Sequence, residues 1–397
     1  MNDYDLAIVG GGLVGASLAV ALHGSGLRVA LIEAAAPPLA EPAWDERCIG
    51  LNEATRRIFD SLGVWGAMRG EAEAIAATHV SEQGRFGVAR FHAAEAGLDA
   101  LGYNTPLRAI HGSLLRRVRE TGAAILLCPA RVDDVQVDGE HVHLRGTALD
   151  GGLRARLLVA ADGARSPIRQ RFGIATETHD YAQTAIVSSV RTQREHAGIA
   201  HERFTPDGPI AVLPRPGRVC TVVWTVPTDV AERLLALSEA AFLQALQAAF
   251  GHRLGQFSAL GRRGAYPLTR VLSTRLVAER TVFVGNAAQT LHPVVAQGFN
   301  LGLRDVATLA DLLPDYSDPG CAALLHAYVD RRRDDRRQAA DFTDGLVRLF
   351  SNRVPGLGEL RHLGLSALNL SGPLKRRMLQ RSLGFGAYTP AAARDRA

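Results

Sequence analysis

The chain has 397 residues, 47% of them hydrophobic, and a formal net charge of +5 at pH 7. This length and apolar content predict two closely packed domains, or one large domain with an insertion, around a sizeable core. The mild positive charge does not indicate a nucleic-acid-binding protein, because basic residues are spread along the chain and mixed with acids, as in "DRRRDDRRQAAD" (330–341), without interleaved aromatics.

The first elements predict a β-α-β unit. "YDLAIVG" (4–10) is a short apolar run with β-branched residues, which predicts a buried strand. "LVGASLAVALHGSG" (13–26) carries apolar residues at helical spacing and ends with two glycines. "RVALIE" (28–33) predicts a second strand. Because a helix joins the two strands, we expect them to lie parallel.

The rest of the chain predicts a second kind of sheet. We expect a helix over 53–62, a helix running into strands over 112–146, and a strand, turn and helix over 156–174. From 184 to 226 the sequence is β-rich, with "PRPG" (214–217) as a hairpin turn, which predicts an antiparallel sheet. The first pattern returns at "RTVFVGNAAQ" (280–289), and the chain beyond Asp305 is mostly helical. The predicted fold class is therefore α/β (α+β), with a Rossmann-like domain, an inserted antiparallel-sheet domain and a helical C-terminal region.

Residue types exclude several other classes of protein. The cysteines are far apart, which predicts reduced thiols and no metal site: Cys48, Cys128, Cys220 and Cys321. The single lysine, Lys375, follows no glycine-rich run, so a P-loop is excluded and a Schiff-base mechanism is disfavoured. The acidic start and the absence of a long apolar window predict a cytoplasmic protein.

"GGGLVG" (10–15) fits the GxGxxG fingerprint between the first predicted strand and helix. Gly10 permits a tight turn, Gly12 lets a pyrophosphate approach the backbone, and Gly15 lets the helix pack closely. The start of the helix offers free N–H groups to phosphate. Glu33 ends the second strand, where the acid that binds a ribose is expected. A packing turn alone would not explain this acid, so we predict a dinucleotide site.

Two further motifs follow in the chain. "LLVAADGARSPIRQRFGI" (157–174) contains Asp162-Gly163, and "GNAAQTLHPVVAQGFNLGLRD" (285–305) contains Asn286 and a Pro- and Gly-containing loop. With the first motif they resemble the aromatic-ring hydroxylase family of single-component FAD monooxygenases, over nearly the whole chain. "DERCIGLNEATRRIFDSLGVW" (45–65) and "TDGLVRLFSN" (343–352) look like its ubiquinone-biosynthesis hydroxylases. Most of the family has Asp at the position of Asn286. With Asn at this position, the motif is similar to that of the 2-polyprenyl-6-methoxyphenol hydroxylase branch.

This resemblance implies where FAD binds. The first motif would hold the ADP half, the DG motif would lie near the pyrophosphate, and the third would hold the ribityl chain and the flavin ring. The implied cofactor-binding residues are Gly10, Gly12, Leu13, Val14, Gly15, Glu33, Arg47, His111, Val132, Asp162, Gly163, Asn286, Gly298, Phe299 and Asn300. The implied domains are a FAD-binding domain (1–75, 105–180 and 270–340), a substrate-binding β-sheet domain (76–104 and 181–269) and a C-terminal helical region (341–397).

The candidates nearest the chemistry are His292, Pro293 and Gln297. His292 has two interpretations: it orients substrate or relays a proton, or it precedes Pro293 and supports the loop. We favour the second, because hydroxyl transfer to a phenol needs no fixed histidine base. Tyr266 could bring a phenol near the ring or could simply pack. No group of residues indicates a bound metal.

The resemblance also implies the reaction. NAD(P)H, bound transiently, reduces FAD, O₂ adds to the reduced ring, and the resulting hydroperoxide hydroxylates a polyprenylated phenol, with the cofactor supplying the difficult chemistry. The alternatives are a hydroxylase acting at another ring carbon or on another aromatic, and a non-catalytic flavin-binding subunit of a biosynthetic complex. Expected partners are other ubiquinone-biosynthesis proteins and the surface of the inner membrane, the latter through "LGLSALNL" (363–370), which could equally be a core helix.

Overall fold

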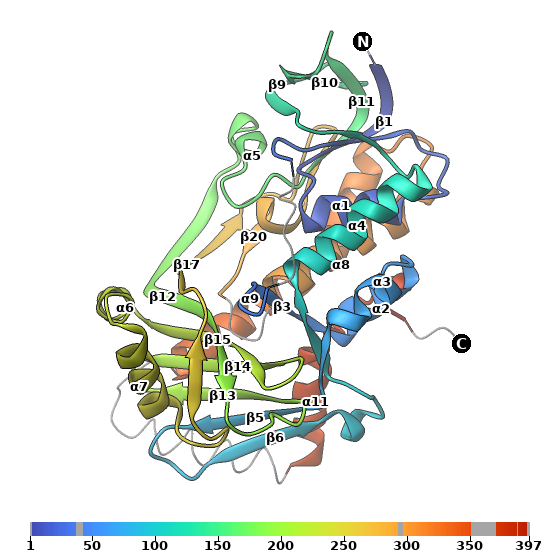
Figure 1. The fold of residues 1–397 in the computed structure, drawn as a ribbon. Coiled ribbons are helices and arrows are strands. Elements are labelled where there is room, and N and C mark those ends of the chain that lie inside the picture. The colour runs from blue at the N-terminus through green and yellow to red at the C-terminus, as the bar shows by residue number, and fades with distance from the viewer. Residues whose placement is uncertain (1, 37–42, 293–296, 351–370, 387, 395–397) are drawn as a thin grey trace.

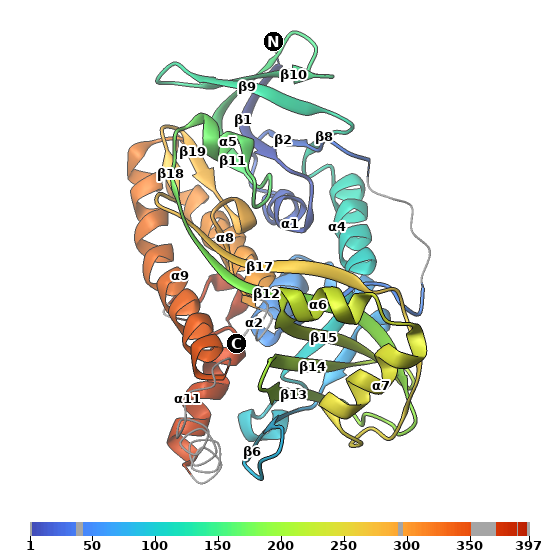
Figure 2. The ribbon, with the colours of Figure 1, turned by 90° about the vertical axis from the view of Figure 1, so that its left-hand side faces the viewer.

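A computed structural model describes residues 2–36, 43–292, 297–350, 371–386 and 388–394 of the chain (Figure 1). The two predicted kinds of sheet are both present, and the expected fold class is confirmed. The Rossmann-like part and the large second sheet occupy opposite ends of the molecule, with helices α8 and α9 running between them (Figure 2). Of the calls made from sequence, Pro293 and the segment 363–370 lie outside the described residues.

The first sheet has eight strands, and its central strands are parallel. Its strands, in spatial order, are β18 (Val277–Ala278), β19 (Thr281–Phe283), β11 (Leu153–Ala160), β1 (Asn2–Val9), β2 (Val29–Ile32) and β8 (Ile125–Leu127), with β10 (Val142–Thr147) and β9 (Arg131–Val137) attached to β11. Every residue of β2 is buried. Both faces of the parallel strands are therefore covered, as the apolar runs of the sequence predicted.

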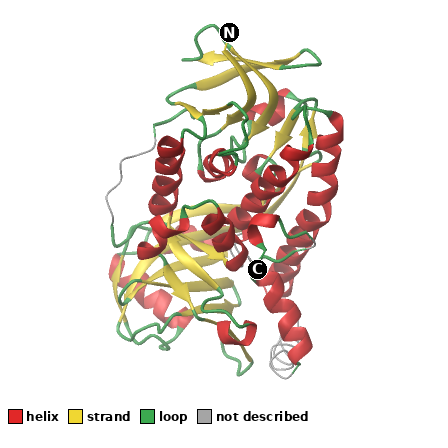
Figure 3. Cartoon of the chain, turned by 90° about the vertical axis from the view of Figure 1, so that its right-hand side faces the viewer, coloured by secondary structure: helices red, strands yellow, loops and turns green. Residues whose placement is uncertain are grey.

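Four helices pack beside this sheet: α1 (Leu13–Ala21), α4 (Leu107–Thr121), α8 (Gln297–Leu312) and α9 (Ala322–Phe350). Helix α1 contacts both α4 and α8, and α8 also contacts α9. A small sheet of β3 (Cys48–Asn52), β7 (Gly102–Pro106) and β4 (Glu73–Ile75) lies between the two main parts, with the short helices α2 (Glu53–Ser61) and α3 (Trp65–Met68) near it. The short helix α5 (Pro167–Arg171) lies at the Rossmann-like end, after β11 (Figure 1). Figure 3 shows this arrangement from the other side.

The second sheet has nine strands and is antiparallel, as expected, apart from one parallel pair. Its order is β20 (Gln289–Thr290), β17 (Gly264–Ser273), β12 (Thr176–Thr192), β15 (Val219–Pro227), β14 (Gly208–Arg215), β13 (Ile199–Thr205), β5 (Ala77–Glu82) and β6 (Val88–His92), with β16 (Phe257–Leu260) on β12. Strands β5 and β13 pair in parallel. They come from distant parts of the chain, and no hairpin forces them to run in opposite directions.

One face of the nine-stranded sheet is covered by α6 (Thr228–Leu235) and α7 (Glu239–Phe250). Trp224 of β15 packs edge-on against Phe242 of α7, with ring centroids 5.6 Å apart. We call this face the outer face and the opposite one the inner face. At the far edge, α11 (Gly372–Ser382) packs Leu379 against Phe91 and Phe204. Strand β12 runs across the predicted domain boundary after 180, and strand β17 runs across the one after 269. The division into domains stays a prediction.

Two glycines let helix α1 approach helix α8. A Cβ added at Gly302 would lie 3.0 Å from the Cα of Gly285 and 3.1 Å from Val14 Cγ2. A Cβ at Gly285, where φ is +58°, would lie 2.9 Å from the same Val14 methyl. The predicted cofactor loops begin at Gly10 and Gly285. They lie side by side because the backbone at Gly285 and Gly302 packs against Val14. No helix in the described ranges is long and apolar enough to cross a membrane.

We predict that Gly302→Ala destabilises the protein, whereas Gly345→Ala does not. The new methyl at position 302 is overpacked, at a cost of roughly 1–3 kcal/mol. Gly345 is an exposed glycine of α9 whose added Cβ would meet nothing within 4 Å, so alanine there should stabilise the helix by up to about 1 kcal/mol. Urea unfolding of both variants measures the difference. Equal free energies of unfolding would show that the contact between the helices is loose.

Candidate functional site

The loop at Gly10–Gly15 forms a cradle at the start of α1. Gly10 has φ +107°, and a Cβ there would lie 2.4 Å from Ala161 O, while one at Gly15 would lie 1.9 Å from Gly10 O. At Gly12 an added Cβ would meet nothing within 4 Å, and no side chain caps the helix. The first N–H groups of a helix have no partner within it. The cradle therefore presents free donors and the positive end of a helix dipole to an anion.

Glu33 and His111 are both attached to this cradle. The Glu33 carboxylate accepts the Gly11 N–H at 2.6 Å and the Ala35 N–H at 2.9 Å. Each of its oxygens keeps a lone pair for a ribose hydroxyl. His111, on α4, lies with Nε2 2.9 Å from Gly11 O. Since a carbonyl can only accept, Nε2 carries the proton and Nδ1 is left as an acceptor.

The DG turn is clamped to the Gly285–Ala287 turn by Arg169. This arginine is 5% exposed and donates to Ala164 O and to Ala287 O, each at 2.8 Å. Gly163 has φ +89°. Burial raises the pKa of the Asp162 carboxyl, and its Oδ1 is buried without a hydrogen-bond partner in the described chain. Such an atom calls for a donor, and a ribityl or ribose hydroxyl would supply one.

The third motif presents Asn286 and the start of α8. Asn286 is exposed although its neighbours Gly285 and Ala287 are buried. Helix α8 begins at Gln297, which is 4% exposed, and a Cβ at Gly298 would meet nothing within 4 Å. Gly298 thus has open space at its Cβ position, as Gly12 does. An amide at position 286 can both donate and accept hydrogen bonds.

Beneath this loop lies a buried ion-pair network that we did not predict. Asp305 accepts the Gly285 N–H at 2.9 Å and the Gln289 side-chain amide at 2.6 Å through one oxygen, and Arg332 Nε at 2.7 Å through the other. Arg332 is 0% exposed and also pairs with Asp335, which receives a hydrogen bond from Arg304. The mixed acids and arginines of 330–341 contain the sequence signal for this network, since Arg332 and Asp335 of that stretch are buried.

Two residues expected to lie against the flavin have other contacts. The Asn300 side chain donates to Gly50 O at 3.0 Å and accepts the Asn52 N–H at 3.1 Å, which fastens β3 to α8. Phe299 is half-buried and stacks on Phe59, with ring centroids 6.1 Å apart. Asn300 therefore positions the strand, and its role in direct flavin contact stays a proposal.

The remaining predicted contacts lie at the two ends of the site. Arg47 is exposed, and its guanidinium stacks over the ring of Tyr266 on β17 at 4.7 Å, joining the small sheet to the large one. At the other end, Ala130 donates its N–H to Glu33 O at 2.8 Å. Val132, two residues later on β9, is half-buried beside the core. The contacts of Arg47 with the flavin and of Val132 with the adenine end of the cofactor stay predictions.

His292 is buried, with 1% of its surface exposed, and its ring packs edge-on against Tyr181 at 5.0 Å. The Tyr181 hydroxyl donates to Asp344, which also pairs with Arg270. Burial lowers the pKa of His292 to about 4, although Asp344 opposes the shift. The imidazole is therefore neutral at pH 7. We expect it to support the loop, which was our preferred interpretation from the sequence.

Taken together, these residues fit FAD. The Gly12 cradle would hold the pyrophosphate, Glu33 the ribose, and Asp162 with Asn286 the ribityl chain, while the open start of α8 would face the ring. The fit rests on the open space at Gly12 and Gly298 and on the unpartnered Asp162 oxygen. In the described part of the chain, no group of three or more His, Cys, Asp and Glu residues could hold a metal ion.

Comparison with known proteins gives the same assignment. The family described as "FAD binding domain" matches residues 3–343. Ubiquinone hydroxylase UbiL of Rhodospirillum rubrum is 40% identical over 96% of this chain and 89% of its own length. The 3-demethoxyubiquinol 3-hydroxylase of Escherichia coli is 34% identical over 96% of this chain and 98% of its own.

Solved structures share the fold. p-Nitrophenol 4-monooxygenase PnpA from Pseudomonas putida DLL-E4 superposes with a TM-score of 0.80 and 18% identity, covering 98% of this chain and all of that one. PqsL of Pseudomonas aeruginosa gives a TM-score of 0.76 with 23% identity, over 92% of this chain and 99% of that one. At these identities the likeness is one of fold.

We predict that Gly12→Asp abolishes FAD retention without unfolding the protein. The added side chain has room, but its carboxylate would meet the pyrophosphate, and affinity should fall at least about a hundredfold, roughly 3 kcal/mol. Gly12→Asn has the same shape without the charge and should lose less. Flavin absorbance of the purified variants and a circular dichroism melt measure the two effects. A fully yellow Gly12→Asp protein would disprove this phosphate position.

We also predict that His292 makes the protein less stable in mild acid. The unfolded chain binds a proton at this histidine below about pH 6.5, whereas the folded chain binds it only near pH 4. Stability is therefore full above pH 6.5 and falls towards pH 4, by at most about 3 kcal/mol. Between pH 7 and pH 5, His292→Asn should lose roughly 2 kcal/mol less than the parent in urea unfolding with excess FAD. An unchanged pH dependence would contradict this assignment.

Proposed function

This chain belongs to the family of FAD-dependent ubiquinone-biosynthesis hydroxylases, and from that premise we propose that it hydroxylates the aromatic ring of a polyprenylated phenol. It is an FAD-dependent aromatic-ring monooxygenase, with NAD(P)H and O₂ as the expected co-substrates. We propose 2-polyprenyl-6-methoxyphenol as the substrate, supported by Asn286 in place of the acid that most of the wider family carries.

The observation that carries the proposal is the inner face of the nine-stranded sheet. Val187 pairs with Val223, and Val223 with Ala211, so these side chains lie on one face. Leu213 lies two residues further along β14 on the same face. All four are half-buried although they stand on interior strands of the sheet. Apolar side chains that are partly open in this position form a wall suited to an apolar substrate.

The residues of the chain would divide the remaining tasks. When bound, FAD supplies the redox and oxygen-transfer chemistry. The Gly12 cradle, Glu33 and Asp162 would bind it, and the buried network under Asp305 would keep the loop beside the ring in place. The backbone N–H groups at the start of α8 would stabilise negative charge on the reduced ring. Tyr266, held by Arg47 at 4.7 Å, would orient the phenol above it.

Two alternatives to this assignment are to be compared with it. The 34% identical Escherichia coli relative is named as a 3-hydroxylase, and this favours hydroxylation at another ring carbon. The carbon that is hydroxylated depends on the shape of the pocket that holds the phenol. A non-catalytic flavin-binding subunit would keep the cradle and lose turnover. The half-buried apolar wall favours the enzyme, because a protein that only carries flavin has no use for an open wall at that place.

We predict that the purified holoprotein oxidises NADH or NADPH faster when a short-tailed 2-polyprenyl-6-methoxyphenol is added, and releases a product heavier by one oxygen atom. Mass spectrometry after turnover in ¹⁸O₂ identifies the added atom, and nuclear magnetic resonance of the product identifies the carbon. A product hydroxylated elsewhere would assign the chain to a sister reaction. Tight FAD binding without stimulated nicotinamide oxidation by any of these phenols would support the non-catalytic alternative.

A further inference from the structure

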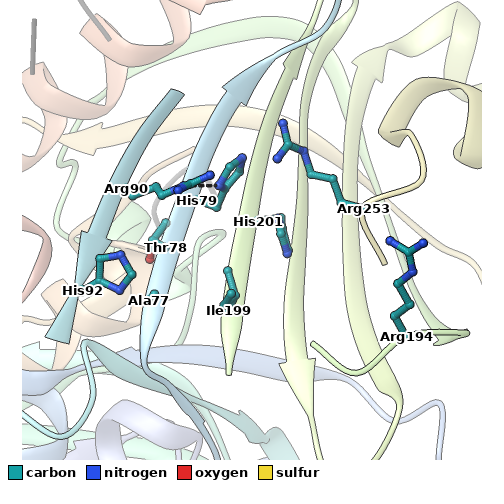
Figure 4. Close-up of a pocket in the computed structure, with 9 residues that line it drawn as sticks. All are labelled: Ala77, Thr78, His79, Arg90, His92, Arg194, Ile199, His201 and Arg253. Atoms are coloured by element: carbon teal, nitrogen blue, oxygen red, sulfur yellow. Dashed lines mark hydrogen bonds between the residues drawn. The ribbon is translucent and has the colours of Figure 1, made fainter. Parts of the chain in front are cut away.

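The outer face of the nine-stranded sheet carries a basic pocket with a cavity volume of about 450 Å³ (Figure 4). It lies next to the C-terminal end of α7, because His201 packs edge-on against Phe250 at 5.7 Å. It therefore opens on the side of the sheet opposite the apolar wall. Its lining residues are Ala77, Thr78, His79, Arg90, His92, Arg194, Ile199, His201 and Arg253.

Strand register assembles the floor of this pocket. His79 stands opposite His201 in the parallel pair of β5 and β13, with ring centroids 5.4 Å apart. His79 also stands opposite Arg90, and Ala77 opposite His92, in the antiparallel pair of β5 and β6. Directly opposed residues share one face of a sheet. Three neighbouring strands thus place His201 and Arg90 on either side of the buried His79.

Two buried ring nitrogens of this floor lack partners. His79 is 6% exposed, and its Nδ1 accepts from Arg90 Nε at 3.4 Å, so its Nε2 carries the proton. That N–H is buried and has no acceptor within the described residues. His201 is 8% exposed, and its Nδ1 is likewise unpartnered in the same part of the chain. Buried polar atoms in folded proteins are nearly always satisfied, by protein, water or ligand.

The charge around the floor is uniformly positive. Arg194 and Arg253 extend from loops beside the strands (Figure 4). Within the described residues, neither of them forms an ion pair. The lining contains no aspartate or glutamate. Burial, assisted by Arg253 and Arg90, lowers the pKa of His79 to about 4. Burial, with His79 and Arg253, does the same for His201. At neutral pH the imidazoles are therefore neutral hydrogen-bonding groups, and the arginines supply the charge.

We propose that this pocket binds a phosphate-bearing anion with at least two phosphoryl groups, at a second site distinct from the flavin cradle. Guanidinium groups pair bidentately with phosphate oxygens, and a neutral imidazole N–H adds a directed hydrogen bond. The cavity is in the size range of small-ligand sites and is much larger than one phosphate needs. The anion is either a free nucleotide or diphosphate, or a lipid headgroup, since both present the same oxygens.

The experiment titrates inorganic pyrophosphate into the FAD-saturated holoprotein by calorimetry. Because FAD fills its own cradle, we expect one pyrophosphate per chain without flavin release. Arg253→Gln and Arg194→Gln should each weaken binding about tenfold or more, the effect of losing one charge-assisted contact. The matched control is Arg233→Gln, which removes an arginine from α6 whose side chain is 67% exposed and pairs with Asp229 at 2.8 Å. This control should bind as the parent does.

Two further arms distinguish the sources of the anion. ADP bound with the same dependence on Arg253 would support a free nucleotide. Flotation with vesicles that contain cardiolipin, whose headgroup carries two phosphoryl groups, lost in Arg253→Gln and kept in Arg233→Gln, would support a lipid headgroup. The proposal is overturned if the holoprotein binds no pyrophosphate at low ionic strength, if both pocket variants bind as tightly as the control, or if the bound pyrophosphate displaces FAD.

Discussion

The buried carboxylate of Asp305 is the constraint on which the flavin side of the molecule depends. It accepts hydrogen bonds from the Gly285 backbone and the Gln289 amide while it pairs with the fully buried Arg332. A buried ion needs all of its partners, and removing one leaves an uncompensated charge at a cost of about 3–5 kcal/mol. The third motif is therefore tied to α8 and α9 from below, and its upper side is left for the cofactor.

Glycines provide the second constraint on this side of the molecule, because they allow two helices to approach closely. Gly285 and Gly302 meet Val14 where a side chain would collide, so the starts of α1 and α8 approach each other. Arg169 then joins the DG turn to the same loop. Three segments distant in the sequence thus form one cradle from backbone groups and a few buried polar side chains. We propose that these segments shape and hold the site of a cofactor that itself supplies the chemistry.

The second sheet illustrates how the two-residue period of a strand allows two environments on one scaffold. The inner face is apolar and half-buried at Val187, Val223 and Ala211, whereas the outer face is packed under α6 and α7. Where α7 ends, that cover stops and the outer face becomes basic. The same strand, β13, therefore contributes to a hydrophobic core and, at His201, to a polar pocket. The two sites face away from each other and can be altered separately.

The sequence by itself determined the features that depend on neighbouring residues. These are the parallel unit at 4–33, the glycine turn at Gly10–Gly15, the placement of Glu33 at the end of the second strand and the family motifs, because strand, turn and helix signals are local and glycine positions reflect backbone needs. Only the tertiary structure decided which distant elements meet. The parallel pairing of β5 with β13, the contact of Asn300 with β3 and the burial of Arg332 each join segments with long separations. A local sequence pattern fixes the face of the strand or helix on which a side chain lies. The residue that it contacts there depends on strand pairing and helix packing, and these are decided by the free energy of the whole chain.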